Sequence, residues 1–148
     1  MFEKFLIFLP QLLSISSMLA FPSSFDDNEK VFFQPPGYVF GIVWTILYML
    51  IGIYLYKLVI GRKTNKYFKF MIVVLIINLL FNLSWTPVVN YYKQYISGIF
   101  MIAVMIMTTF LLITIDNNEM TRVLLVPYLS WLFMALLLNI ELSRIYKK

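Results

Sequence analysis

The stretch FQPPGYVFGIVW, residues 33–44, places two prolines and a glycine directly before a long apolar run. Proline suits the first turn of a helix, where its missing N–H leaves no hydrogen bond unmade, and it pushes the preceding residue toward extended backbone. Pro35 and Pro36 therefore predict a stiff, extended segment that ends where a helix begins at Gly37.

The composition of the chain indicates a membrane protein. Of its 148 residues, 61% are hydrophobic and 13% are charged, about half of the roughly 25% that is typical of soluble domains. A soluble domain of this size could not cover so much apolar surface, and the length allows a single domain, residues 1–148. The net charge of +5 comes from basic residues in short loops and ends. That pattern is typical of membrane topology and not of a nucleic-acid surface, so no nucleic-acid partner is expected.

The chain contains no cysteine and no histidine. The absence of cysteine excludes disulfides and thiol chemistry. Histidine is the commonest general base, the commonest metal ligand and the usual haem ligand. We therefore expect no catalytic residue, no bound metal and no resident cofactor.

Five stretches are apolar enough to cross a bilayer, which takes about 20 residues in a helix. They are residues 5–21, 37–59, 67–91, 95–115 and 122–145, with the longest link at 22–36. The first stretch is short and interrupted by Pro10. A signal peptide is the alternative for it, but the broken apolar core favours a span. The predicted fold class is an all-α integral membrane protein, a bundle of five transmembrane helices.

Five spans place the two termini on opposite sides of the membrane. Seven basic residues fall on the N-terminal side and five on the other, so the positive-inside rule favours a cytoplasmic N-terminus by a small margin. The first set is Lys4, Lys57, Arg62, Lys63, Lys66, Lys69 and Arg122, and the second is Lys30, Lys93, Arg144, Lys147 and Lys148.

A polar stripe follows the third span. Asn78, Asn82, Trp85 and Val89 recur at helical spacing. An asparagine that faced lipid would leave its amide unpaired at a cost of several kcal/mol, so this face must point into the bundle or a cavity. For Asn78 we favour a hydrogen bond between helices. For Asn82 with Trp85, a role between helices and a role toward a ligand stay equally open.

The second span carries glycines and large aromatic residues on one face. Gly37 and Gly41 form a GxxxG pattern, which favours close packing or dimerisation. Trp44 and Tyr48 lie one and two turns deeper than Gly41, below the interfacial belt that ordinarily explains Trp and Tyr. Large aromatic side chains at that depth suit a flat apolar ligand with one polar handle.

The fifth span repeats this theme. Its stripe consists of Tyr128, Trp131, Ala135, Leu138 and Leu142, with Asn139 beside it. Glu141 is the one acid close to the interior of a span, and such acids are functional candidates by default. Arg144 follows at i+3, which favours an ion pair near the headgroups instead.

Three segments of the chain together resemble one family. They are PPGYVFGIVWTILYMLIGIYLY (35–56), NLLFNLSWTP (78–87) and LLVPYLSWLFMALLLN (124–139). In this order, within residues 30–144, they are similar to the TspO/translocator protein family, also called tryptophan-rich sensory proteins or peripheral-type benzodiazepine receptors. The resemblance implies a five-helix bundle, usually a homodimer, in a bacterial membrane or the mitochondrial outer membrane.

The resemblance also implies a ligand pocket inside the bundle, beneath the loop that joins the first two spans. Its ligands would be porphyrins of the haem type, cholesterol and other sterols, and synthetic benzodiazepine- or isoquinoline-type compounds. Carried over by position, the ligand-binding residues are Trp44, Tyr48, Asn82, Trp85, Trp131, Ala135 and Leu138. The loop over the pocket contributes Phe33, Pro35, Pro36 and Tyr38.

The first loop departs from the family pattern. Ser24 and Phe25 stand where members have a Trp-Tyr pair, Val31 and Phe33 replace the Pro and Trp that follow the Lys matched by Lys30, and Tyr38 replaces a Trp after the two prolines. Loop tryptophans are linked to light-dependent porphyrin breakdown in some members, so we expect binding to be kept and that activity to be lost.

The sterol-recognition pattern at the end of the fifth span is also altered. Leu137 stands where the pattern needs a Tyr, and a displaced match runs through Leu142, Tyr146 and Lys148. We therefore expect a membrane receptor, sensor or transporter, with a porphyrin-degrading enzyme as the alternative. A polar-solute channel ranks last, because the polar residues cluster on one helix.

Overall fold

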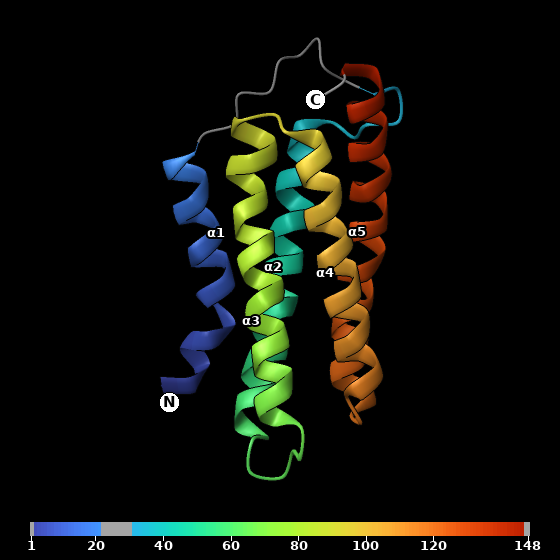
Figure 1. Cartoon of the computed structure of the whole chain (residues 1–148). Coiled ribbons are helices and arrows are strands. Elements are labelled where there is room, and N and C mark those ends of the chain that lie inside the picture. The colour runs from blue at the N-terminus through green and yellow to red at the C-terminus, as the bar shows by residue number, and fades with distance from the viewer. Residues whose placement is uncertain (1, 22–30, 147–148) are drawn as a thin grey trace.

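The computed structural model describes residues 2–21 and 31–146 (Figure 1). Its elements are the 3-10 helix η1 (Phe2–Ile7), α1 (Leu9–Ala20), α2 (Gly37–Ile60), α3 (Phe68–Trp85), the π-helix η2 (Thr86–Tyr91), α4 (Tyr95–Ile115) and α5 (Glu119–Tyr146). No strand occurs in these ranges. Four helices are long and apolar enough to cross a membrane alone, namely α2, α3 continued by η2, α4 and α5. The prediction of an all-α membrane protein is confirmed.

The first predicted span is present in two pieces. Pro10 is the second residue of α1, so it helps to begin this helix and does not interrupt it. The six residues of η1 and the twelve of α1 together reach about 30 Å, the thickness of the hydrocarbon core of a bilayer. The 3-10 helix η1 and the short helix α1 together are therefore long enough to span the hydrocarbon core, which was predicted to be crossed by one interrupted helix.

The third span changes from α- to π-helix at Pro87. Proline has no N–H, so the Leu83 carbonyl, four residues earlier, loses its usual helical partner. The π-helical turn is closed by the Tyr92 N–H, which donates to the Pro87 carbonyl at 2.9 Å. The Leu83 carbonyl instead accepts a hydrogen bond of 3.2 Å from the Ser17 hydroxyl. One proline thus gives α1 a point of attachment to α3.

The fifth helix begins at Glu119 and not at the predicted residue 122. The Asn118 side chain accepts a hydrogen bond of 3.0 Å from the Met120 N–H. Thr121 in turn donates to the Asp116 carboxylate at 2.5 Å. The Asn118 side chain satisfies one of the free N–H groups of the first helical turn, and the Thr121–Asp116 bond ties this turn to the preceding residues.

The five crossing segments form a closed ring. Contacts run from α1 to α2, then to α5, α4 and α3, and from α3 back to α1, while the consecutive helices α2 and α3 contact one another little. We call the end with η1 and residues 61–67 and 116–118 the basal end, and the end with residues 31–36 and 92–94 the loop end. The chain begins at the basal end and α5 finishes at the loop end (Figure 1).

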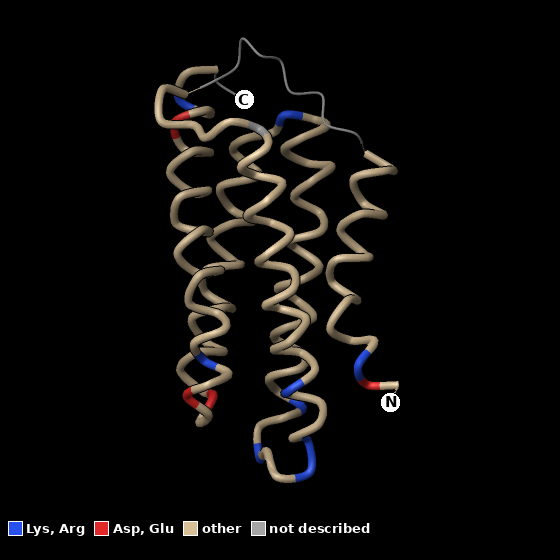
Figure 2. The backbone as a smooth tube through the Cα atoms, turned by 180° about the vertical axis from the view of Figure 1, so that it is seen from behind, with Lys and Arg blue, Asp and Glu red and all other residues tan. Residues whose placement is uncertain are grey.

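Basic residues gather at the basal end, around the link between α2 and α3 (Figure 2). Arg62 in this link pairs with Glu3 of η1 at 3.2 Å. This distribution agrees with the sides to which the sequence assigned these residues. The orientation of the bundle in the membrane stays a prediction.

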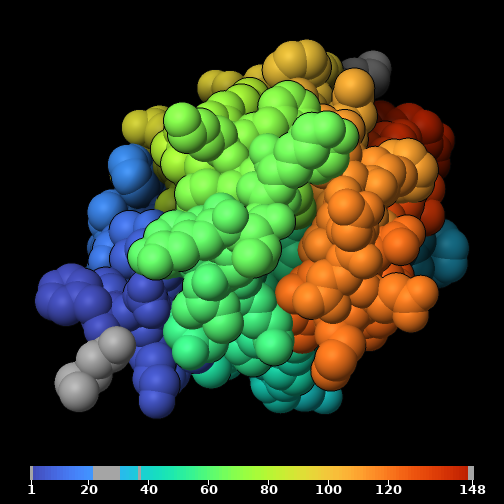
Figure 3. Space-filling view, turned by 90° about the horizontal axis from the view of Figure 1, so that it is seen from below, coloured from blue at the N-terminus to red at the C-terminus, as the bar shows by residue number. Residues whose placement is uncertain are grey.

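At the basal end, η1 packs closely on α2, and Figure 3 shows it lying against the end of the bundle. A Cβ atom on Gly52 would lie 1.8 Å from the carbonyl oxygen of Ile7, so only glycine fits there. Gly41 differs, because nothing lies within 4 Å of a Cβ placed on it. Close packing within the chain is therefore found at Gly52 and not at Gly41, and dimerisation through the GxxxG pattern stays a prediction.

Candidate ligand-binding cavity

A cavity of about 780 Å³ lies inside the bundle toward the loop end. Its walls come from α1, residues 34–35, α2, the α3–η2 segment and α5, with Ile102 and Met105 of α4 behind them. Pockets for small organic ligands usually measure about 300–1,000 Å³. The cavity therefore has the size of a site for one drug-sized or somewhat larger molecule.

The structure brings most of the predicted site residues to this cavity. Its lining includes Trp44, Tyr48, Asn82, Trp85, Ala135 and Leu138, and Pro35 from the predicted covering loop. Phe33, Pro36 and Tyr38 do not line it, and the Phe33 and Tyr38 side chains are 39% and 71% exposed. Ser24, Phe25 and Lys30, and likewise Lys147 and Lys148, lie outside the described residues.

Trp131 lies outside the large cavity. It lines a smaller pocket of about 390 Å³ between α2 and α5, with Pro127 and Ser130 beside it. Its ring meets Phe40 edge-on at a centroid distance of 5.6 Å, and Phe40 does line the large cavity. Trp131 therefore stands behind the wall of the cavity. Ligand binding by any of these residues stays a prediction.

Aromatic rings form one wall of the cavity. The rings of Trp44 and Tyr48 are 5.4 Å apart and tilted by 31°, and Trp44 also meets Tyr128 edge-on at 6.4 Å. Rings held by such contacts keep their orientation and present a broad apolar surface. This wall suits the face of a flat apolar molecule.

A chain of hydrogen bonds begins at this wall and crosses the bundle. The Tyr48 hydroxyl donates to Asn82 Oδ1 at 2.5 Å, and Asn82 Nδ2 donates to the Tyr128 hydroxyl at 2.8 Å. Tyr128 donates in turn to Asn78 Oδ1 at 2.8 Å. The chain joins α2, α3 and α5 through side chains that are at most 5% exposed. Sequence reasoning placed Tyr128 in the stripe of the fifth span but did not select it as a site residue.

Asn78 extends this chain to α4. Its Nδ2 lies 3.0 Å from the Met105 carbonyl, 2.7 Å from the Thr108 hydroxyl and 2.9 Å from the Thr109 hydroxyl. The predicted role of Asn78 between helices is confirmed. Asn82 bridges helices and also lines the cavity, so its role between helices is shown and its role toward a ligand stays a prediction.

Three buried polar atoms around the cavity have no hydrogen-bond partner among the described residues. They are Gln11 Oε1, Trp85 Nε1 and Asn139 Oδ1, two acceptors and one donor. A buried polar group without a partner costs about 1–3 kcal/mol, so each can gain from a complementary group on a ligand. Gln11 was missed by sequence reasoning, although a glutamine inside an apolar stretch is a signal of this kind.

The cavity is neutral. No charged side chain of residues 2–21 or 31–146 lines it, and in the same ranges no cluster of acidic side chains could hold a metal ion. Val31, which stands where the family pattern has a proline, is buried against Val89, Leu138 and Leu142. This contact fixes the end of the first loop beside the cavity.

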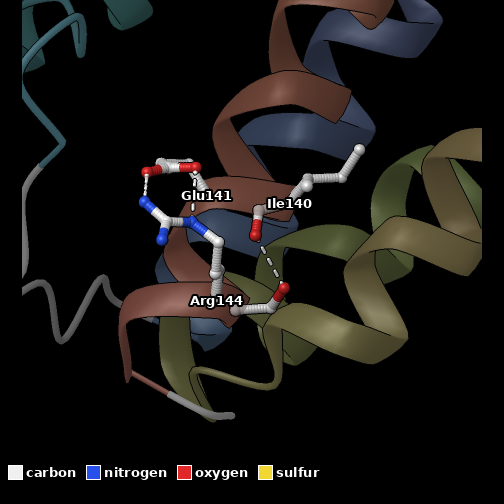
Figure 4. A network of polar contacts seen from close by, with 4 residues as sticks. Ile140, Glu141 and Arg144 are labelled. Atoms are coloured by element: carbon white, nitrogen blue, oxygen red, sulfur yellow. Dashed lines mark hydrogen bonds and ion pairs between the residues drawn. The ribbon is translucent and has the colours of Figure 1, made fainter.

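Glu141 faces away from the cavity. It forms an ion pair with Arg144 on the loop-side end of α5, next to the bond from Ser143 to the Ile140 carbonyl (Figure 4). The Arg144 side chain is largely exposed. The predicted ion pair of Glu141 with Arg144 is confirmed, and its place near the headgroups stays a prediction.

Comparisons with known proteins agree with these features. The sequence profile of the TspO/MBR family matches residues 6–145. The chain is 32% identical to a tryptophan-rich protein TspO of Archaeoglobus fulgidus over 75% of its own length and 72% of that protein. It is 30% identical to a tryptophan-rich sensory protein of Cereibacter sphaeroides, over 82% and 75% of the two chains.

The family match covers nearly the whole chain, and the helices have the length and composition of membrane spans. The protein is therefore a multi-pass integral membrane protein. The family match, which includes a relative named a sensory protein, supports a role as a membrane sensor or receptor. The chain belongs to the TspO/MBR family.

Proposed function

We propose that this protein is a membrane receptor, sensor or transporter that binds flat ring systems in the large cavity. Porphyrins are the first candidates, and sterols such as cholesterol and benzodiazepine-type compounds are the second. The observation that carries the proposal is a neutral cavity of about 780 Å³ with an aromatic wall and unpaired polar atoms. This combination suits an apolar body that carries a few hydrogen-bonding groups.

In this proposal the ring system lies against Trp44 and Tyr48. Trp85 Nε1 donates to an acceptor on the ligand, and Gln11 Oε1 accepts from a donor such as a pyrrole N–H or a hydroxyl. Ionised carboxylates do not fit inside, because no cation lines the described part of the cavity and a buried unpaired charge is costly. The carboxylates of a porphyrin would stay outside the cavity at the loop end, near the headgroups.

Light-dependent porphyrin breakdown is the alternative function. It would need a reactive aromatic ring close to the ligand, and Trp44 and Trp85 are the tryptophans that line the cavity. The loop positions that carry tryptophan in other members hold Phe33 and Tyr38, which are exposed and do not line the cavity. We therefore propose binding without breakdown. A homodimer, as the family resemblance implies, is part of the same proposal.

The test is a titration of the purified protein with protoporphyrin, followed by quenching of tryptophan fluorescence. We expect saturable quenching with a Kd of micromolar order or tighter, which corresponds to about 8 kcal/mol. Quenching that rises without saturation would overturn the proposal for porphyrins.

The alternative is tested with the same complex under illumination. Porphyrin absorbance should decay no faster with the protein than with detergent alone. Faster decay that is lost on substitution of Trp44 by Phe would favour the enzyme.

A further inference from the structure

Helix α1 is attached to different neighbours at its two ends. At the basal end, η1 rests on α2 through the Ile7–Gly52 contact and the Glu3–Arg62 ion pair. Toward the loop end, the attachments go to the α3–η2 segment. The Ser17 hydroxyl bonds the Leu83 carbonyl at 3.2 Å, and the ring of Phe21 meets that of Tyr91 at 5.8 Å. The first segment therefore leans from α2 toward α3 along its length.

Between α1 and α2 the cavity is lined by exposed residues. Ile15 and Met18 of α1 line the cavity and are 43% and 58% exposed. Gly41 and Thr45 of α2 also line it and are exposed. No atom lies within 4 Å of a Cβ placed on Gly41. We call these four residues the side opening.

The side opening lies within the apolar part of both helices. Gly41 and Thr45 are about 6 and 12 Å along α2 from its first residue, at 1.5 Å per residue. They belong to the span from Tyr38 to Ile60. The Thr45 hydroxyl donates to the Gly41 carbonyl at 2.8 Å. Its hydrogen-bonding group is satisfied within the helix, so the rim presents an apolar face to the hydrocarbon.

We propose that the ligand enters and leaves the cavity sideways, from the bilayer, through the side opening between α1 and α2. The ligand class is then a flat amphiphile that dissolves in the membrane, whose ring system passes between Met18 and Gly41 while its polar groups stay at headgroup level. This inference rests on the proposed function. It adds that the ligand reaches the cavity from the bilayer and by which route.

The chain has no cysteine of its own, so a single introduced thiol can be used to block the opening. The experiment uses the full chain in lipid vesicles in which protoporphyrin has been dissolved beforehand. A bulky maleimide is attached to the variant Met18→Cys. The matched control is Ile42→Cys, which is 57% exposed on α2 but does not line the cavity. Association and dissociation rates are measured by fluorescence before and after labelling.

We expect the label on Met18→Cys to slow association and dissociation together by about tenfold or more, with Kd changed by less than about threefold. Labelled Ile42→Cys should keep the rates of the unlabelled protein. Unchanged rates in labelled Met18→Cys overturn the inference, and so does a loss of affinity through faster dissociation alone. A lack of saturable binding in the unmodified protein overturns the proposed function itself, and the inference with it.

Gly41→Leu is a second variant. The open space at Gly41 lets it fold, and its side chain narrows the opening from the other helix. The same slowing of both rates is expected. A changed oligomeric state with unchanged rates would identify this face as a contact between two copies of the chain and would overturn the inference.

Discussion

The two ends of the bundle use the same kinds of residue in opposite ways. Toward the basal end, Asn78 bonds three residues of α4 and Gly52 touches the backbone of η1. Around the cavity, Trp85 Nε1 and Asn139 Oδ1 are unpaired and Gly41 faces open space. Polar groups toward the basal end bond one helix to another, whereas the unpaired polar groups around the cavity are free to bond a ligand.

The largest effect is expected for Gly52→Ala. The added Cβ would meet the Ile7 carbonyl at 1.8 Å, and backbone cannot yield as a side chain can. We expect a loss of about 3 kcal/mol or more in stability, measured as thermal unfolding in detergent. Gly41→Ala is the control and should leave stability almost unchanged. Equal losses of stability in both variants would contradict the difference in packing between the basal end and the cavity.

Asn78→Leu comes next. It removes the bonds to Met105, Thr108, Thr109 and Tyr128, and hydrogen bonds between membrane helices are worth about 0.6–2 kcal/mol each. We expect a stability loss of about 2–3 kcal/mol, near the lower end of this range for four bonds, with protoporphyrin affinity changed by less than about twofold. Asn82→Leu should lower both quantities. A large loss of affinity in Asn78→Leu would show that the chain of hydrogen bonds and the cavity cannot be separated.

Trp85→Phe should weaken protoporphyrin binding by about five- to tenfold, or about 1–1.4 kcal/mol, since the indole N–H is free to donate to a ligand. Thermal stability should fall by less than about 1.5 kcal/mol, because only part of the packed ring is lost and no hydrogen bond among the described residues is broken. Trp131→Phe is the matched control. Its Nε1 is also unpaired but lies at the second pocket, so binding should be kept. Equal weakening in both variants would place the ligand elsewhere.

The smallest effect is expected for Lys93→Gly in the turn between η2 and α4. Lys93 has a φ of 55°, a left-handed conformation that glycine adopts without strain. We expect a gain of less than about 1 kcal/mol in stability and unchanged ligand affinity. A loss of stability would mean that the Lys93 side chain contributes more than the turn conformation costs.

The predicted spans were closest to the structure where the sequence marks them locally. Pro35 and Pro36 correctly predicted that α2 begins at Gly37. The bounds predicted for α4 are those of the structure, because an apolar run flanked by polar turns defines a helix from the local sequence alone. The division of the first span into η1 and α1 could not be predicted in this way. It depends on the contact of Ile7 with Gly52, which are far apart in the sequence.

The candidate site was predictable to the extent that helical spacing defines a face. Trp44, Tyr48, Asn82 and Trp85 share the cavity as their stripes indicated. Spacing does not say how a helix is rotated against its neighbours, and for this reason Trp131 lies behind Phe40. The bond from Ser17 to the Leu83 carbonyl could not be predicted either. Pro87 indicates that this carbonyl lacks its helical partner, but not which group donates to it instead.

The odd number of crossings has a practical consequence for placing reporters. The helix η1 begins at the basal end and α5 finishes at the loop end (Figure 1). A pH-sensitive fluorophore fused ahead of η1 and a second one fused behind α5 would therefore sit in different compartments. Acidifying one compartment would dim only the fluorophore on that side. If the fluorophore behind α5 dims, the loop end faces the acidified compartment.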